Sequence, residues 1–461
     1  MKYFKSFFGI LFLVISILSS VFTSEARDED LVQSCISEYK EKTKCDAVSM
    51  VVYRDENMYY YGSKDDYYQI GSMTKAFTGL GIEKLIQEGK ISRKDKVEEY
   101  LPGFEMYFEG QKADIRILDL LSQTSGFTNS ERDYPSAEEN MTLSQWVTTI
   151  SGKELQFKPG TKYSYSNVNY NLLGAIIETV SGISYKEYME QEILIPLGLE
   201  QTFVGMPPKE KSIVKGTRLG YWNVYDFEMP VKEGAIPAGY FYSNLSDMGR
   251  WMEIWLGKAD IPSEYKELIE KTKECLKQEG DYYSGWECFP DGVIGHSGGT
   301  ANYSSRIVYS PEKEVGVCVL TNVNVSASTD RLCNDVFSRM TGAQPAGFTY
   351  DIWTIFDDIF GVVTILGMVL LFIVGKLKNI RTMLGVDLAV SVLLISISLV
   401  MPILFQASLG SILFVWAPWS VLGGLLALLL DFLVINIKIW MWKRNEMHNK
   451  ERATQPGGLQ G

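Results

Sequence analysis

The sequence predicts a mixed α/β (α+β) domain that is exported and is followed by three membrane-spanning helices. Three observations lead to this expectation. The chain of 461 residues begins with a short apolar stretch behind two lysines. Its middle part combines helix-patterned stretches with strand-like runs rich in β-branched residues, such as Ser304–Tyr309 and Val315–Leu320. Its last part, after Tyr350, contains three long apolar segments.

Residues 1–26 have the pattern of a signal peptide. Two lysines precede the apolar run Phe7–Phe22, and Ser24-Glu25-Ala26 offers small residues at the positions that a signal peptidase reads. The alternative is an uncleaved membrane anchor. About 16 apolar residues are few for a membrane span, so cleavage is the better expectation.

The C-terminal apolar segments are each long enough to cross a hydrocarbon core of about 30 Å. They are apolar on nearly all sides, unlike the helices of a soluble bundle. We expect spans at about Ile355–Val374, Leu384–Phe405 and Ile412–Ile435. Among the acidic residues near these segments, only Asp431 lies well inside a predicted span. Three short helices show no transport pathway, so anchoring is the expected role.

The charges between the spans predict their orientation. The connection between the first two spans carries Lys376, Lys378 and Arg381, whereas residues 406–410 between the last two carry no charge, and several basic residues follow the third. By the positive-inside rule, the first connection and the tail are cytoplasmic. We therefore expect a multi-pass protein of the plasma membrane with a signal peptide (1–26), an extracytoplasmic domain (27–345), three spans (350–442) and a cytoplasmic tail (443–461).

Composition limits the classes of partner. The net charge is −12 although the tail is basic, so the exported domain is acidic, which argues against a nucleic acid partner. All six cysteines precede the membrane part, and an even number in an oxidising compartment makes disulfides an expectation, with pairing of sequence neighbours as one possibility. No Cys/His spacing resembles a metal site, and we expect neither a metal nor another cofactor.

The most informative local motif is Ser72-x-x-Lys75, in a chain with two histidines. Residues three apart share one face of a helix, so the hydroxyl and the ammonium would meet in one pocket. A serine needs a neighbour to take its proton before it can act as a nucleophile. With so little histidine available, Lys75 is the expected base.

Two further clusters carry polar groups. Tyr165 and Asn167 follow a Pro-Gly turn and precede an apolar helical run, at a junction that can present a phenol and an amide to a cleft. Gly295-His296-Ser297-Gly298-Gly299 precedes the strand-like runs. This last cluster also fits the G-x-S-x-G nucleophile elbow, but no helix follows its serine, and the one later histidine lies beyond the membrane segments, so the elbow is rejected.

Together, Ser72-x-x-Lys75, Tyr165-x-Asn167 and His296-Ser297-Gly298 occur in the order and approximate spacing of the penicillin-recognising serine hydrolases. The chain resembles the class C β-lactamase-like branch, which includes D,D-carboxypeptidases, D-aminopeptidases and esterases. The resemblance covers about residues 40–345. Additional stretches that match are Ile115–Gly126, Phe157–Thr161, Pro196–Leu199, Pro237–Gly239 and Leu320–Asn322.

The resemblance implies an antiparallel sheet with helices on both faces and a helical lobe. It implies that Ser72 is the nucleophile, that Lys75 and Tyr165 share proton transfer, and that Asn167 holds a substrate amide. His296, Ser297 and Gly298 would line the strand beside the substrate. The N–H groups of Ser72 and Gly299 would form the oxyanion hole.

Two departures from the family pattern bear on the substrate. The family's β-lactamases and carboxypeptidases usually have Lys where His296 stands, and a neutral imidazole binds a substrate carboxylate less well. Gln123 replaces a common His, with an expected structural consequence.

We therefore expect a serine hydrolase that cleaves amides of D-amino-acid-containing peptides through an acyl-enzyme, on a substrate derived from peptidoglycan or on an N-acyl-D-amino-acid prodrug. The three spans resemble those of membrane-bound peptidases that mature such prodrugs. The alternatives are an esterase on the same machinery and a non-catalytic sensor.

Overall fold

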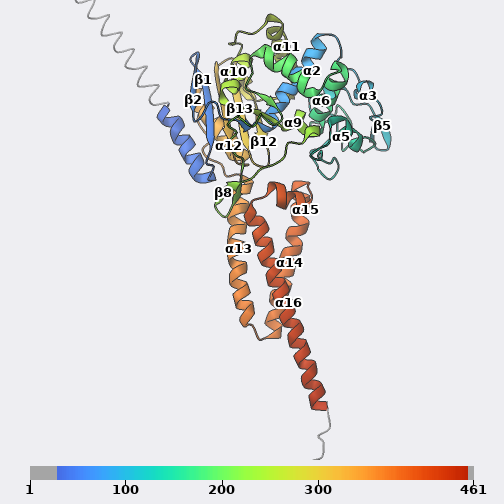
Figure 1. Ribbon diagram of the computed structural model, residues 1–461, viewed down its shortest axis with the longest axis vertical. Coiled ribbons are helices and arrows are strands. Elements are labelled where there is room, and N and C mark those ends of the chain that lie inside the picture. The colour runs from blue at the N-terminus through green and yellow to red at the C-terminus, as the bar shows by residue number, and fades with distance from the viewer. Residues whose placement is uncertain (1–28, 455–461) are drawn as a thin grey trace, which may run out of the picture.

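The computed structural model describes residues 29–454. It places an α+β domain on top of a bundle of three long helices (Figure 1). The predicted signal peptide lies outside the described residues. The domain begins with a helix over residues 29–43, and its last helix ends at Met340.

A seven-stranded antiparallel sheet forms the centre of the domain. Its strand order is β10-β11-β12-β13-β14-β1-β2, so the first strand of the chain, β1, pairs with the last one, β14. The strands are β1 (Val48–Arg54), β2 (Asn57–Tyr61), β10 (Tyr282–Tyr283), β11 (Trp286–Cys288), β12 (Ile294–Gly299), β13 (Ser304–Ser310) and β14 (Val315–Thr321). The structure thus confirms the antiparallel sheet.

Both faces of the sheet are covered, because neighbouring residues of a strand point to opposite faces. Val51 and Tyr53 of β1 pack into the larger core with α2, α10 and α11. Met50 and Val52 of the same strand pack into a second core with the helix of residues 29–43 and α12. The helices that cover the sheet are α10 (Leu245–Leu256), α11 (Ser263–Glu279) and α12 (Ser326–Met340).

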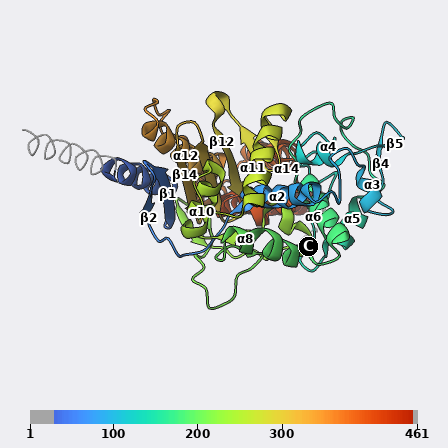
Figure 2. The ribbon, with the colours of Figure 1, turned by 90° about the horizontal axis from the view of Figure 1, so that it is seen from above.

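A helical lobe extends from the sheet on the far side of α2, as the views in Figures 1 and 2 agree. Helix α2 (Thr74–Gln87) is buried from Thr74 to Leu85, so it is the shared wall between lobe and sheet. The helices of the lobe and its surroundings are α3 (Val97–Tyr100), α4 (Ile117–Leu121), α5 (Leu143–Ile150), α6 (Asn167–Ser181), α7 (Tyr185–Met189), α8 (Ile195–Leu197) and α9 (Ile236–Gly239).

Short strands complete the domain. A three-stranded sheet has the order β3-β9-β6, and two hairpins pair β4 with β5 and β7 with β8. Their bounds are β3 (Tyr68–Gln69), β4 (Met106–Phe108), β5 (Gln111–Ala113), β6 (Phe203–Val204), β7 (Thr217–Gly220), β8 (Asn223–Asp226) and β9 (Phe241–Ser243).

Three helices of the C-terminal part are long and apolar enough to cross a membrane: α13 (Ile352–Lys376), α14 (Ile380–Phe405) and α16 (Trp419–Thr454). Large apolar side chains such as Phe372 and Ile403 face outward and are exposed. Helices α13 and α14 lie near the expected positions of the first two predicted spans.

The expected start of the third span at Ile412 is wrong. A one-turn helix, α15 (Leu409–Ser411), and a π-helix, η5 (Ile412–Trp416), precede α16, and Pro418 separates η5 from it. Proline has no N–H to donate and restricts the residue before it, so the helix restarts at Trp419.

The β7–β8 hairpin attaches the domain to the helix bundle. Asp357 of α13 accepts hydrogen bonds from the backbone N–H groups of Tyr221 and Trp222 at the hairpin turn, at 2.8 and 2.6 Å. Ser420 of α16 donates to the same carboxylate at 2.6 Å. Both turn residues have positive φ angles, and the aspartate supplies the acceptors that their N–H groups need.

Within residues 29–454, which include all six cysteines, the structure has no disulfide bond, although the sequence made disulfides an expectation. Their local partners explain this. Cys333 on α12 donates to the backbone carbonyl of Val317, and Cys45 donates to that of Ala47. Cys318 is buried in the sheet. An even count in the sequence does not bring pairs of sulfur atoms together.

The Asp357 junction leads to a stability prediction. Asp357→Asn replaces one acceptor oxygen with an N–H₂ group that faces a donor, and we expect it to cost about 2–3 kcal/mol of folding stability. The neighbouring Asp358 is exposed, so Asp358→Asn is the matched control with no expected loss. Thermal unfolding of the full chain in detergent measures both variants. Equal Tm values for the two variants would show that the junction does not stabilise the protein.

Candidate functional site

Ser72 lies in a one-turn 3₁₀-helix (Gly71–Met73) that leads directly into α2. Glycine is required before it. Gly71 has a φ of +53°, and a Cβ atom there would lie 2.5 Å from the backbone nitrogen of Gly299. The end of β12 therefore approaches the backbone of Ser72 as closely as two glycines allow. The serine is half-buried and lines a cavity.

Lys75 is fully buried one turn further along α2. Its Nζ donates to Ser72 Oγ at 2.9 Å, to Asn167 Oδ1 at 2.7 Å and to the backbone carbonyl of Ala238 at 2.6 Å. All three acceptors are uncharged oxygens. Burial alone therefore lowers the pKa of Lys75 well below its usual value. The structure brings Ser72 and Lys75 together as the spacing predicts.

Tyr165 lies beside this pair. The centre of its ring is 5.0 Å from Lys75 Nζ, and the side chain lines the cavity. Burial raises the pKa of Tyr165 far above its usual value, although a hydrogen bond with Ser72 opposes the shift. The side chain is thus a neutral phenol near Ser72, able to donate a proton rather than to remove one from serine.

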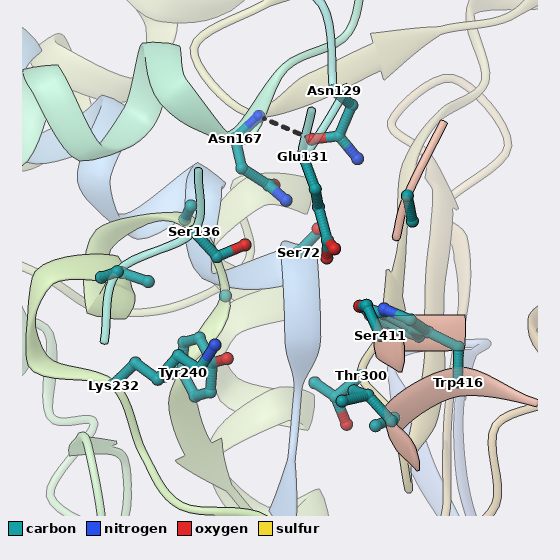
Figure 3. A pocket seen from close by; sticks show the side chains of 18 of the residues that line it. Ser72, Asn129, Glu131, Ser136, Asn167, Lys232, Tyr240, Thr300, Ser411 and Trp416 are labelled. Carbon is teal, nitrogen blue, oxygen red and sulfur yellow. Dashed lines mark hydrogen bonds between the residues drawn. The ribbon is translucent and has the colours of Figure 1, made fainter. Parts of the chain in front are cut away.

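Asn167 is the first residue of α6, and its side chain reaches the cavity (Figure 3). Ser166 caps the helix by accepting from the N–H of Val168. Because Asn167 Oδ1 accepts from Lys75, the Nδ2 group is left to meet a substrate acceptor.

Gln123 holds the loop that carries Tyr165 and Asn167. Its side-chain oxygen accepts from the N–H of Ser166 at 2.9 Å, and its backbone carbonyl accepts from the N–H of Ser164 at 2.8 Å. It is fully buried with a φ of +57°. A longer amide in place of histidine therefore has the structural role that the sequence predicted.

His296 of β12 is buried behind the catalytic candidates and does not line the cavity. Its Nδ1 lies 2.6 Å from its neighbour's carbonyl, that of Ser297, and its Nε2 lies 3.2 Å from the hydroxyl of Tyr282. A carbonyl can only accept, so Nδ1 carries the proton and Nε2 accepts from Tyr282. Burial, together with the charge of Lys75, lowers the pKa of His296 to about 3.

The other residues of this cluster have different places. Ser297 donates to Asp330 and accepts from Arg306, at 2.9 and 2.7 Å. Gly298 packs on the segment before Ser72, where a Cβ would lie 2.1 Å from the carbonyl oxygen of Ile70. Of the four residues predicted on this strand, Gly299 lines the cavity and the other three do not.

The cavity has a volume of about 590 Å³, and Ser72 is part of its lining. Residues of the α+β domain that the sequence did not single out line most of it; Figure 3 labels the polar Asn129, Glu131, Ser136, Lys232 and Tyr240, and apolar residues such as Pro135, Trp146 and Met229 also belong to the lining. Residues of α13 and of the connection between α14 and α16 line another part, where Figure 3 labels Ser411 and Trp416. No motif pointed to either set.

Within residues 29–454, no group of three or more His, Cys, Asp or Glu side chains is placed to hold a metal ion. The reactive groups of the site are the side chains of Ser72, Lys75 and Tyr165. Together they form a hydroxyl, a desolvated amine and a neutral phenol in contact, which is an arrangement suited to nucleophilic catalysis.

Comparison with known proteins agrees with this arrangement. The family model described as Beta-lactamase matches residues 32–336. Protein flp of Staphylococcus aureus (strain MW2) is 32% identical over 323 residues, which cover 68% of this chain and 64% of that protein. The chain thus spans less than two thirds of the length of this relative. The Beta-lactamase of Escherichia coli (strain K12) is 24% identical, over 68% of this chain and 93% of that protein.

Solved structures show the same fold. The octameric penicillin-binding protein homologue from Pyrococcus abyssi matches with a TM-score of 0.61 and 25% identity, over 72% of this chain and 81% of that one. A class C beta-lactamase matches with a TM-score of 0.59 and 18% identity, over 70% and 98% of the two chains.

The neutral state of His296 leads to a pH prediction. Its folded pKa lies below the usual unfolded value of about 6.5, so below that pH the unfolded chain binds a proton that the folded chain does not. This histidine therefore costs stability as pH falls from about 6.5 towards 3, by about 1.4 kcal/mol per pH unit. We measure thermal unfolding of the wild type and of His296→Gln between pH 7 and pH 4. As the pH falls, the Tm of the wild type should decrease more than that of His296→Gln. Parallel curves would contradict a buried neutral imidazole.

Proposed function

The chain belongs to the beta-lactamase family of serine hydrolases, and on that basis we propose that it cleaves amides of D-amino-acid-containing peptides through an acyl-enzyme on Ser72. The observation that carries the proposal is the contact between Ser72 Oγ and a lysine that is fully buried among uncharged oxygens. Burying a lysine without a carboxylate partner costs free energy and gives no structural benefit that an apolar side chain would not give. We therefore infer that Lys75 is buried here for its chemistry.

The contacts of Lys75 support its role as the general base. Asn167 Oδ1 and the carbonyl of Ala238 each accept one hydrogen of the amine. In the neutral amine these two bonds direct the lone pair towards Ser72, whose hydroxyl then becomes the donor. Ser72 gives its proton to Lys75 Nζ as its Oγ bonds to the substrate carbonyl carbon.

Tyr165 is suited to the second half of the acylation. Its high pKa keeps it a phenol that can pass the proton held by Lys75 to the leaving nitrogen while the C–N bond breaks. Water then attacks the ester on Ser72, with the same pair removing and returning a proton. The carbonyl oxygen would be held by the N–H groups of Ser72 and Gly299, and the close approach at Gly71 supports this pairing.

The surroundings of His296 bear on the substrate. A neutral, buried imidazole supplies no positive charge at the place where lysine stands in the carboxypeptidases that the chain resembles. The nearby Arg306 is buried and already bonded to Ser297 and Glu287. Recognition of a free C-terminal carboxylate is therefore disfavoured, and a D-peptide cleaved away from its C-terminus fits better. The same feature favours the second candidate, an esterase that uses the same residues.

We also propose the topology that the basic residues predict. Residues 27–345 would lie outside the plasma membrane, and residues 443–461 would lie in the cytoplasm. The three helices that could cross a membrane support an anchored enzyme. Substrates would then be peptides derived from peptidoglycan or N-acyl-D-amino-acid prodrugs that are available on the outer side.

A substrate panel tests the proposed reaction. The full-length protein in detergent is given D-amino-acid peptides and amides, their L-counterparts, short acyl esters and a β-lactam, with Ser72→Ala alongside. We expect release of an amine from the D-series by the wild type, and a loss of at least about 10³-fold in Ser72→Ala, as for other nucleophile replacements. Turnover of esters alone would select the esterase, and turnover that survives in Ser72→Ala would contradict both.

A further inference from the structure

One side of the active-site cavity is built by the membrane part of the chain. The connection between α14 and α16 (residues 406–418, here the α14–α16 linker) lies between the helix bundle and the α+β domain (Figure 1). Together with neighbouring residues of α13 and α14 it forms an apolar wall of the cavity that contains Ser72. We define this apolar wall as Trp353, Phe405, Ala407, Ile412, Val415 and Trp416.

Two aromatic residues of the apolar wall pack against each other. The rings of Trp353 and Phe405 stack with centres 4.8 Å apart and planes 16° apart, which ties the start of α13 to the end of α14. Ile412 is fully buried, whereas Val415 and Trp416 are partly exposed towards the cavity. Covering the exposed apolar side chains of a cavity with an apolar group of a ligand removes them from water, which favours binding of that group.

Arg218 on β7 fixes the α14–α16 linker against the α+β domain. Its guanidinium donates to the backbone carbonyls of Leu413, Phe414 and Ala417, at 2.6, 3.1 and 2.5 Å. These carbonyls lie at and beyond the C-terminal end of the π-helix η5, where helices leave acceptors unpaired and favour a positive charge. The same group stacks 4.0 Å from the ring of Trp419.

The burial of Arg218 indicates a dedicated role. The side chain of Arg218 is 2% exposed. Within residues 29–454, no carboxylate forms an ion pair with it. Burial lowers the pKa of Arg218 to about 10, so it is charged at neutral pH. Burying a cation costs free energy. Because all the hydrogen bonds of Arg218 go to the α14–α16 linker, we interpret Arg218 as the residue that holds this linker in place.

We propose that the apolar wall is a substrate subsite that takes an apolar chain attached to the substrate near its scissile bond, and that Arg218 is the positioning residue that holds it. The inference rests on the proposed function, because the wall shares its cavity with Ser72. An apolar chain on this side would leave the polar groups elsewhere in the lining, such as Glu131 and Lys232, to the peptide-like part of the substrate. The membrane helices then contribute to specificity as well as to anchoring.

The test is a chain-length series with the full-length protein in one detergent. One series of esters varies the acyl group from acetyl through butyryl to octanoyl with a constant leaving group, and a second varies the leaving group. Burial of each methylene is worth about 0.8 kcal/mol, so kcat/KM should rise about fourfold per methylene along one of the series. The rise should stop where the chain outgrows the cavity.

Variants assign the effect to the wall. Val415→Asn places a polar side chain of similar size in the wall, and the ratio of octanoyl to acetyl kcat/KM, or its leaving-group equivalent, should fall at least tenfold. Arg218→Met should lower the same ratio through KM, and Arg218→Lys should restore part of it because it keeps a cation beside the linker. Arg250→Met is the matched control, since Arg250 donates to the carbonyls of Leu197 and Asp260 instead. Its ratio should equal that of the wild type.

Each outcome decides the proposal. A flat response to chain length in both series, or an unchanged ratio in Val415→Asn, overturns the subsite. A change in Arg250→Met as large as that in Arg218→Met would make Arg218 a general stabilising residue and overturn its positioning role. Labelling of Ser72 by a fluorophosphonate distinguishes failure of the proposed function from failure of the subsite. A folded wild type with neither labelling nor turnover overturns the proposed function, and with it this inference.

Discussion

The burial of Lys75 without a negative partner is the constraint on which the rest of the site depends. Its ammonium has three uncharged acceptors and no contact with solvent. Burial favours the neutral amine of Lys75 over the ammonium. The neutral amine can accept the proton of the Ser72 hydroxyl, which is the first step of the proposed reaction. The surrounding fold maintains this situation. Helix α2 is buried along most of its length, α6 and α9 supply the two fixed acceptors, and glycines let β12 close over Ser72.

The C-terminal helix bundle and the α+β domain are joined by direct contacts of the β7–β8 hairpin. Asp357 binds the turn of the β7–β8 hairpin from below, and Arg218 on the same hairpin binds the α14–α16 linker from above. One hairpin thus sets both the place of the domain on the bundle and the shape of the cavity.

The sequence predicted the parts of the site that follow from local spacing. Ser72 and Lys75 meet because they are three residues apart at the start of a helix. Tyr165 and Asn167 lie at a loop-to-helix junction, as the Pro-Gly turn and the apolar run after it indicated, although Ser166 and not Asn167 caps the helix. Features that depend on distant packing were missed. Ile412–Trp416 is as apolar as a span, so composition assigned it to one, although Pro418 marked the break. The buried orientation of His296 and the free cysteines depend on which side chains meet across the sheet, which no local pattern specifies.

The most direct test of the account is the pH dependence of the rate at which a fluorophosphonate labels Ser72, in the wild type and in Asn167→Asp, followed by intact mass. The substitution is nearly isosteric and places a carboxylate beside Lys75 Nζ, where Asn167 Oδ1 now lies 2.7 Å away. A carboxylate favours the ammonium and should raise the pKa of Lys75 by about 1–3 units. Labelling in the variant should therefore be slower at neutral pH and recover at higher pH, with its rise displaced upward by about that amount. An undisplaced profile would contradict Lys75 as the base.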